Sequence, residues 1–252
     1  MKILKYRKGK GNEYKIITDK DEYKLYDDII IKYELLLKKD IDDKDFTKIL
    51  EENKLFSAYY DALKLINTKL RTEKEIKVLL KKKEYNYKEI DYAIKKLDKE
   101  GYLNHKVYIE AFIHDMLNLY LIGEDKILKD LVNLGFEEKE IRLYLDKIDK
   151  DIYKDKIDKY INKKLKANKK SEIEFKRKVL GELINKGFSK NDIMIFLENT
   201  NVVEDEEVTR RLIIKLYNKY IKKYDYNTVK LKIRNYLYQK GYKDIDIDKY
   251  IK

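Results

Sequence analysis

The sequence predicts a mostly helical protein: an elongated array of tandem three-helix repeats, each similar to a helix-turn-helix, with a small N-terminal β-hairpin or meander. Three observations predict this fold. A segment of 15 residues recurs four times at nearly constant spacing, and proline is absent from all 252 residues. Within each copy, apolar residues follow the helical period rather than the strand period. A repeat of about 50 residues is typical of stacked helical units.

The recurring segment is clearest in residues 131–145 (LVNLGFEEKEIRLYL) and 183–197 (LINKGFSKNDIMIFL). Looser copies occupy residues 80–94 and 237–251, and all four align without a gap. Each begins with leucine and has an aromatic residue five places on, followed by isoleucine after five more. In the first copy Glu84 stands where the others have glycine. That turn must either hold a strained residue or take another shape.

The second copy shows how each repeat folds. Ile127 and Leu131 lie four residues apart, on one face of a helix. Gly135 follows where a helix can end in the left-handed conformation, which costs glycine little. Ile141 and Leu145 then share the buried face of a new helix. The pattern predicts helix, tight glycine-aromatic turn, helix, and it places Gly135, Gly187 and Gly241 between helices.

Capping residues and further apolar stretches locate the remaining helices. Capping boxes are predicted at Thr72–Glu75 and Ser171–Glu174, and caps at Asn86–Glu89 and Ser189–Asp192. A leading helix precedes each pair, near residues 58–69, 106–120, 151–167 and 206–223.

The start of the chain has a different pattern. Apolar and polar residues alternate on both sides of KGKGN at 8–12, which indicates two strands and a turn. A third strand at 23–26 would make a meander, and a helix follows with Asp27 or Asp28 as its cap. We therefore divide the chain into an N-terminal part and four three-helix repeats: 1–57, 58–104, 105–149, 150–203 and 204–252.

Positive charge is concentrated in the second half of the chain. The net charge is +12, and residues 150–252 hold 27 Lys and Arg against 16 Asp and Glu. Such a basic half suggests an anionic partner, nucleic acid first. The alternative is a solvated surface, because an AT-rich coding bias also produces abundant Lys, Ile, Asn and Tyr.

The best candidates for anion contacts lie in the runs KKLKANKK (163–170) and KRK (176–178) and in a later arginine pair. A solvated linker between helices is the competing interpretation of the first run. The candidates for binding nucleic acid or a filament are Lys163, Lys164, Lys166, Lys169, Lys170, Arg177, Arg210 and Arg211.

No pattern for catalysis or cofactor binding is found. The chain has no cysteine, its eight glycines form no phosphate-binding loop, and no nucleophile is paired with a base. His105 and His114, the two histidines, lie near opposite ends of one predicted helix and do not converge on a metal. We expect no enzyme activity, no metal, no cofactor and no small-molecule substrate. Without a signal peptide or an apolar run of about 18 residues, we expect a cytoplasmic protein with no membrane span.

Three stretches resemble the RecX family of recombination regulators: LRTEKEIKVLL (70–80), GYLNHKVYIEAFI (101–113) and IGEDKILKDLVNLGF (122–136). Two departures from the family pattern are His105, where Asp is usual, and Glu84, where Gly is common. Most of the matching positions are caps, turns or core, so they predict the fold first. The matching positions are Arg71, Thr72, Glu75, Gly101, Tyr102, Leu103, Asn104, Tyr108, Gly123, Ile127, Leu131 and Gly135.

The resemblance implies a regulator that acts by binding. Its members bind the RecA recombinase filament on DNA and lower its ATPase, strand-exchange and repressor-cleavage activities. It implies RecA as partner. From the basic half of the chain we also expect weak contact with single-stranded DNA, and we expect a monomer. The alternative is a helical repeat protein that binds DNA or RNA directly, without sequence preference.

Overall fold

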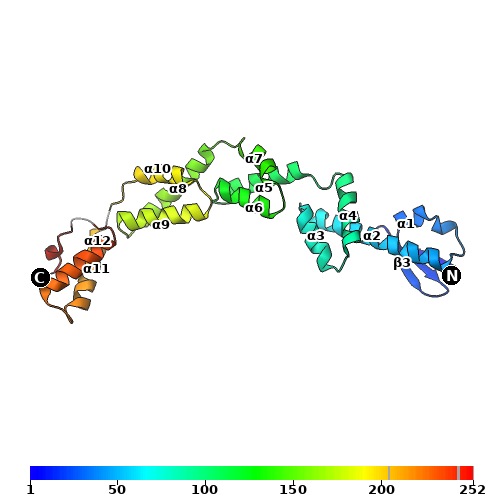
Figure 1. Ribbon diagram of the computed structural model, residues 1–252, viewed down its shortest axis with the longest axis horizontal. Helices are drawn as coiled ribbons and strands as arrows, with labels where there is room; N and C mark the ends of the chain where they lie inside the picture. Colours follow the sequence, from blue (N-terminus) through cyan, green and yellow to red (C-terminus); the bar gives the residue numbers. More distant parts are fainter. Residues whose placement is uncertain (204, 243–244, 252) are drawn as a thin grey trace. The chain divides into compact units, whose positions relative to one another are not determined.

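A computed structural model describes residues 1–203, 205–242 and 245–251. The described residues form three strands, twelve α-helices and two short 3₁₀ helices (Figure 1). Their contacts divide into two compact units: Met1–Ala111 with Asn133–Phe136, and Phe112–Val132 with Glu137–Lys252. The prediction of a mostly helical fold with a small N-terminal sheet is confirmed.

The N-terminal sheet is an antiparallel meander. Its strands are β1 (Ile3–Lys8), β2 (Glu13–Thr18) and β3 (Glu22–Tyr26), in the order β1-β2-β3. Gly11, in the predicted KGKGN turn, has a φ of +62°, which a residue with a side chain seldom adopts. The three-strand alternative of the sequence prediction is therefore correct.

The first helix follows the sheet without a side-chain cap. Helix α1 (Asp27–Lys32) has Tyr26 as its N-cap, and the 3₁₀ helix η1 (Leu35–Leu37) comes next. The prediction of Asp27 or Asp28 as cap is wrong. The backbone N–H of Asp27 still bonds to the carbonyl of Asn12 at 2.9 Å, so sheet pairing reaches the first helical residue. Both aspartates instead lie in the first turn, where they favour the helix dipole.

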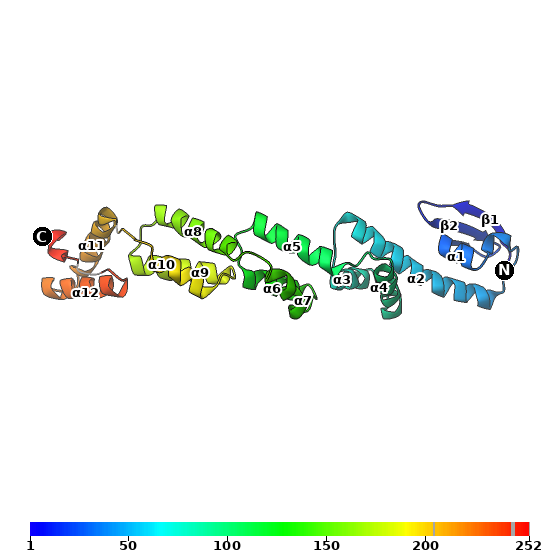
Figure 2. The ribbon, with the colours of Figure 1, turned by 90° about the horizontal axis from the view of Figure 1, so that it is seen from above.

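Helix α2 (Asp43–Thr68) starts 15 residues before the predicted leading helix of the first repeat. Asp42 caps it by accepting the N–H of Lys44 at 2.8 Å. The early part of α2 buries Phe46 and Ile49 against the sheet and α1, and Figure 2 shows these elements together. The helix thus runs without interruption through residue 57, from the N-terminal core into the first repeat.

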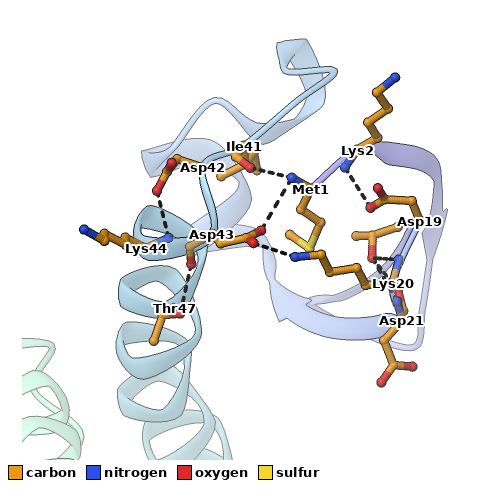
Figure 3. A network of polar contacts seen from close by, with 11 residues as sticks. Met1, Lys2, Asp19, Lys20, Asp21, Ile41, Asp42, Asp43, Lys44 and Thr47 are labelled. Atoms are coloured by element: carbon orange, nitrogen blue, oxygen red, sulfur yellow. Dashed lines mark hydrogen bonds and ion pairs between the residues drawn. The ribbon is translucent and has the colours of Figure 1, made fainter.

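A polar network joins residues that precede β1 and follow β2 to the start of α2 (Figure 3). The α-ammonium group of Met1 donates to the carbonyl of Ile41 at 3.1 Å and lies 3.5 Å from the Asp43 carboxylate. Lys20 pairs with the same carboxylate at 2.5 Å. Because Lys20 follows β2, this carboxylate connects two parts of the N-terminal unit to one helix start.

The remaining helices occur in consecutive groups. The first repeat continues from α2 with α3 (Glu73–Lys82) and α4 (Tyr87–Lys99). The next groups are α5 (His105–Leu119), α6 (Glu124–Asn133) and α7 (Glu138–Leu145), then α8 (Asp151–Lys166), α9 (Glu172–Asn185) and α10 (Lys190–Glu198). The last group holds α11 (Glu206–Tyr220), α12 (Tyr226–Gln239) and the 3₁₀ helix η2 (Ile247–Lys249).

The fourth repeat differs from the prediction in its third element. In the described part of this segment a 3₁₀ turn, η2, takes the place of a third α-helix. Residues 245–248 read IDID, an alternation of period two, which does not give a helix one continuous apolar face. Ile247 and Ile251 are nevertheless buried, so the segment still closes the last core.

The predicted caps are confirmed at four helix starts. Thr72 and Asn86 each form a capping box with the glutamate three residues later. Ser171 and Ser189 accept the backbone N–H groups three residues on, at 3.3 and 3.4 Å. The capping box predicted at Ser171 forms only this half, and its Glu174 side chain pairs with Lys240 at 2.9 Å. Each cap satisfies a backbone donor that the helix itself leaves free.

The turns after the middle helices have the predicted left-handed backbone. The φ angles of Gly135, Gly187 and Gly241 are +105°, +82° and +86°. Glu84, at the same position of the first repeat, has a φ of +66°. Of the two possibilities left open for that turn, the protein keeps the shape and holds a strained residue.

We expect Glu84→Gly to stabilise the protein by about 1 kcal/mol, because glycine adopts positive φ without the strain of a side chain. Glu84 is exposed, so the substitution removes little packing. Urea unfolding of the two proteins measures the difference. An unchanged or lower midpoint would contradict the inference of strain at this turn.

Candidate functional site

One kind of contact recurs between neighbouring repeats, and we call it the turn joint. In it, the glycine turn after one middle helix docks on the first turn of the preceding middle helix. Gly123 donates its N–H to the carbonyl of Lys186 at 2.9 Å, and Asp125 donates to that of Gly187 at 3.1 Å. The start of α6 thus satisfies its free backbone donors with the turn after α9.

Close approach of the two backbones at this joint requires glycine on both sides. A Cβ atom built on Gly123 would overlap the carbonyl of Gly187, and one built on Gly187 would overlap the backbone of Lys126. Gly123 is one of the family-motif positions, and this contact explains its lack of a side chain.

Two further turn joints use the same elements with other bonds. Lys74 at the start of α3 donates to the carbonyl of Asn133 at 2.9 Å, beside Gly135. At the start of α9, the Ser171 hydroxyl donates to the carbonyl of Lys240, whose ammonium group pairs with Glu174 at 2.9 Å. The turn with Glu84 follows the first middle helix, which has no preceding middle helix among the described residues, and its side chain is exposed.

Other family-motif positions also have structural roles. Arg71 donates from Nε to the carbonyl of Leu65 at 3.0 Å, which holds the α2–α3 turn. Asn104 accepts the N–H of Val107 at 3.1 Å and caps α5. Gly101 ends α4 with a φ of +78°, and Tyr102 is exposed.

Tyr108 lies where α5 meets the turn after α6. Its ring centroid is 5.3 Å from that of Phe136. Burial, together with the nearby Glu75 carboxylate of the capping box, raises the pKa of Tyr108 to about 12. The hydroxyl therefore stays protonated, and Thr72, Glu75, Tyr108 and Phe136 connect the first two repeats within one unit.

The predicted anion contacts are distributed over three helices and one loop. Arg210 and Arg211 both lie near the Glu207 carboxylate, at 3.5 and 3.0 Å, and none of the described hydrogen bonds or ion pairs connects them with α8. The eight residues are on α8 (Lys163, Lys164, Lys166), in the α8–α9 loop (Lys169, Lys170), on α9 (Arg177) and on α11 (Arg210, Arg211).

A basic pocket of about 740 Å³ includes two of these residues, Lys163 and Lys164. We call it the α5–α8 pocket. Sequence reasoning missed most of it, because its two walls are more than 30 residues apart in the chain. Only the spacing of Lys156, Lys159 and Lys163 along α8 could have signalled one basic helix face. The pocket is lined by residues 117–121, Lys156, Lys159, Tyr160, Lys163, Lys164, Ala167 and Lys186.

Two of the lysines in the α5–α8 pocket have fixed partners. Lys156 donates to the carbonyls of Leu117 at 2.6 Å and Tyr120 at 2.8 Å, at the end of α5, and burial lowers the pKa of its ammonium group. Lys164 pairs with Glu182 at 3.0 Å, and that hydrogen bond raises the pKa of Lys164. The Tyr160 hydroxyl also donates to Glu182, at 2.6 Å.

The two histidines make separate contacts. The His105 ring meets Phe136 edge-on, with centroids 5.0 Å apart, whereas His114 is exposed beside Asp115. In the part of the chain that the structure describes, no three potential metal ligands come together.

Across the same described residues, no helix has both the length and the apolar character needed to cross a bilayer.

Comparison with known proteins gives consistent results. Residues 58–97 match the family model for the RecX first three-helix domain. The chain is 30% identical over 249 residues to a protein of Bacillus cytotoxicus named "Regulatory protein RecX", covering 97% of this chain and 89% of the relative. A Bacillus mycoides protein of the same name is 29% identical, with 96% and 88% covered.

Two solved structures share the fold. One, described as a crystal structure of regulatory protein RecX, superposes with a TM-score of 0.67 at 23% identity, covering 78% of this chain and 98% of the other. The RecX of Lactobacillus salivarius gives a TM-score of 0.53 at 22% identity, with 60% and 99% covered. The identity over nearly the full chain and the three-helix repeats agree. The chain belongs to the RecX family of regulatory proteins.

Proposed function

We propose that this protein lowers the activity of RecA recombinase by binding the RecA–DNA filament. One observation carries the proposal: the similarity to proteins named "Regulatory protein RecX" extends over 97% of the chain. The first three-helix domain of the family accounts for only the first repeat, whereas the similarity to whole RecX proteins includes the later repeats as well. We also propose that one monomer is the unit that binds.

The organisation of the repeats supports a binding role. Three turn joints connect consecutive middle helices, each through bonds between a turn and a helix start. Several similar helix faces on one chain can contact several protomers of a filament. A molecule bound in this way inhibits more than one protomer, and a second contact made by the same molecule becomes intramolecular.

The proposal predicts inhibition of the host RecA ATPase and strand exchange at fewer than one molecule per RecA protomer. The assay uses filaments formed on saturating single-stranded DNA, with more DNA added in steps. A protein that acts on the filament keeps its effect in excess DNA. Loss of inhibition as DNA is added would instead favour the alternative, a protein that competes for nucleic acid.

Weak, salt-sensitive binding to single-stranded DNA is a second expected property. Among the described residues, Lys163, Lys166, Lys169 and Lys170 have no carboxylate within ion-pair distance, whereas Lys164 is paired with Glu182. Each substitution of one of these lysines by glutamine should reduce the magnitude of the slope of log affinity against log salt by up to about 0.7. The reason is that binding releases fewer counterions when a phosphate contact is lost.

Fluorescence anisotropy at several salt concentrations measures this slope. Lys139→Gln is a control, because Lys139 is an exposed lysine of α7, outside the basic segment, with no ion-pair partner among the described residues. An equal slope for all variants would identify residues 163–170 as a solvated segment.

A further inference from the structure

The α5–α8 pocket combines positive charge with an apolar floor. Lys156, Lys159, Lys163 and Lys164 lie on one face of α8, at spacings of three, four and one residues. Lys186, in the turn after α9, adds a further ammonium group. Opposite them is the end of α5 with the residues that follow it, Leu117 to Leu121, all within the second compact unit.

Three of the five ammonium groups have no partner in the described structure. Lys156 is held by the carbonyls at the end of α5, and Lys164 is held by Glu182. No carboxylate lies within ion-pair distance of Lys159, Lys163 or Lys186 in the described part of the chain. The pocket thus keeps a positive potential that a carboxylate or phosphate group would neutralise.

The apolar floor leaves two large side chains exposed to solvent. Leu119 is 70% exposed and Tyr120 56% exposed, beside the half-buried Leu117 and Leu121. Lys156 donates hydrogen bonds to the carbonyls of Leu117 and Tyr120. These bonds hold the backbone of the segment in place while Leu119 and Tyr120 stay exposed to solvent. A clustered apolar surface of this kind, with a polar rim, is typical of a protein interaction site.

The aromatic rings of the pocket do not form a platform for nucleic acid bases. The Tyr160 ring has the Lys164 ammonium group 5.1 Å from its centroid, and its hydroxyl is bound to Glu182. Tyr120 is the one remaining ring in the lining, and the leucines provide no stacking face. A nucleic acid would leave Leu119 uncovered, whereas an apolar protein side chain would cover it.

We propose that the α5–α8 pocket binds an acidic segment of a protein partner. A large apolar side chain of that segment packs on Leu117, Leu119 and Leu121, and flanking carboxylates pair with Lys159, Lys163 and Lys186. Taking the partner to be the RecA filament rests on the function proposed above; the acidic and apolar chemistry of the segment does not.

The test uses Leu119→Ser and Lys159→Glu, with Leu143→Ser and Lys139→Glu as matched controls. Leu143 and Lys139 are exposed residues of α7 outside the pocket. Each control therefore makes the same type of substitution as its pocket variant at another exposed position. We expect both pocket variants to raise the concentration for half-inhibition of RecA ATPase about tenfold. The controls should leave it within twofold, and Leu119→Ser should leave the affinity for single-stranded DNA unchanged.

A peptide assay separates this inference from the proposed function. The probes are a fluorescent peptide with one leucine among aspartates and glutamates, and the same peptide with serine for leucine. The full-length protein should bind the leucine peptide at least fivefold more tightly, and Leu119→Ser should abolish the difference. Equal binding of both peptides, or no binding of either, would overturn the inference.

The two assays fail in distinguishable ways. Selective peptide binding without any effect on RecA would reject RecA as partner but support the pocket as a binding site for an acidic segment. Inhibition of RecA that Leu119→Ser does not weaken would reject the pocket and keep the function. A parallel loss of single-stranded DNA affinity in Leu119→Ser would identify the pocket as a nucleic acid site and overturn the proposed partner chemistry.

Discussion

Replacing Gly187 by valine is expected to lower the free energy of unfolding by about 2–6 kcal/mol. Two effects add at this residue. The φ of +82° disfavours any β-branched side chain, which costs about 1–3 kcal/mol. The new Cβ atom also meets the backbone of Lys126 in the turn joint, and forced overpacking costs about 1–3 kcal/mol.

Three other glycines separate these two effects. Gly101 has a φ of +78° and open space around its missing Cβ atom, so Gly101→Ala should cost about 1 kcal/mol from strain alone. Gly123 has no positive φ but faces the Gly187 carbonyl, so Gly123→Ala should cost about 1–3 kcal/mol from overlap alone. Gly181, exposed within α9 with nothing near it, should gain about 0.5–1 kcal/mol as alanine.

Urea unfolding of the four variants, fitted with a common slope, measures these differences. From the most to the least stable protein, the order should be Gly181→Ala, wild type, Gly101→Ala, Gly123→Ala and Gly187→Val. If Gly123→Ala is no less stable than Gly101→Ala, the turn joint contributes little and the repeats are connected mainly through their cores.

Deleting residues 200–252 should weaken inhibition of RecA at least fivefold while the preceding repeats stay folded. The deleted part contains its own core, formed by residues of α11, α12 and the segment through Ile251. Its polar bonds to α9 include those of Ser171 and Glu174 with Lys240. Repeat proteins lose terminal units locally, because each unit contacts only its neighbours.

Under the proposed function, the expected loss of inhibition comes from lost contacts with the filament and lost positive charge. A full-length variant with glutamine at four exposed lysines on and just after α11 tests the charge alone; these are Lys215, Lys219, Lys222 and Lys223. Circular dichroism checks that the truncated protein keeps the helices of its remaining repeats. Inhibition at full strength by the truncated protein would show that the last repeat adds nothing to binding.

Much of the local structure could be predicted from sequence. The caps at Thr72, Asn86, Ser171 and Ser189 depend on residues within one helical turn, and so do the left-handed glycine turns. The fourfold recurrence then extended each local inference to all repeats. The errors occurred where the local signal was weak: the cap of α1, the early start of α2 and the short 3₁₀ turn in place of a last helix.

The sequence by itself determined the repeats, the positions of their turns and the concentration of basic residues near the C-terminus. Only the tertiary structure decided what those turns do and where the charges lie. Gly123 meets Gly187, and Lys156 meets the end of α5, because docked helices bring together residues far apart in the chain. Helical periodicity specifies which face of a helix is buried, but not which backbone that face will contact. The turn joints and the α5–α8 pocket depend on which helices dock against each other, which periodicity does not specify.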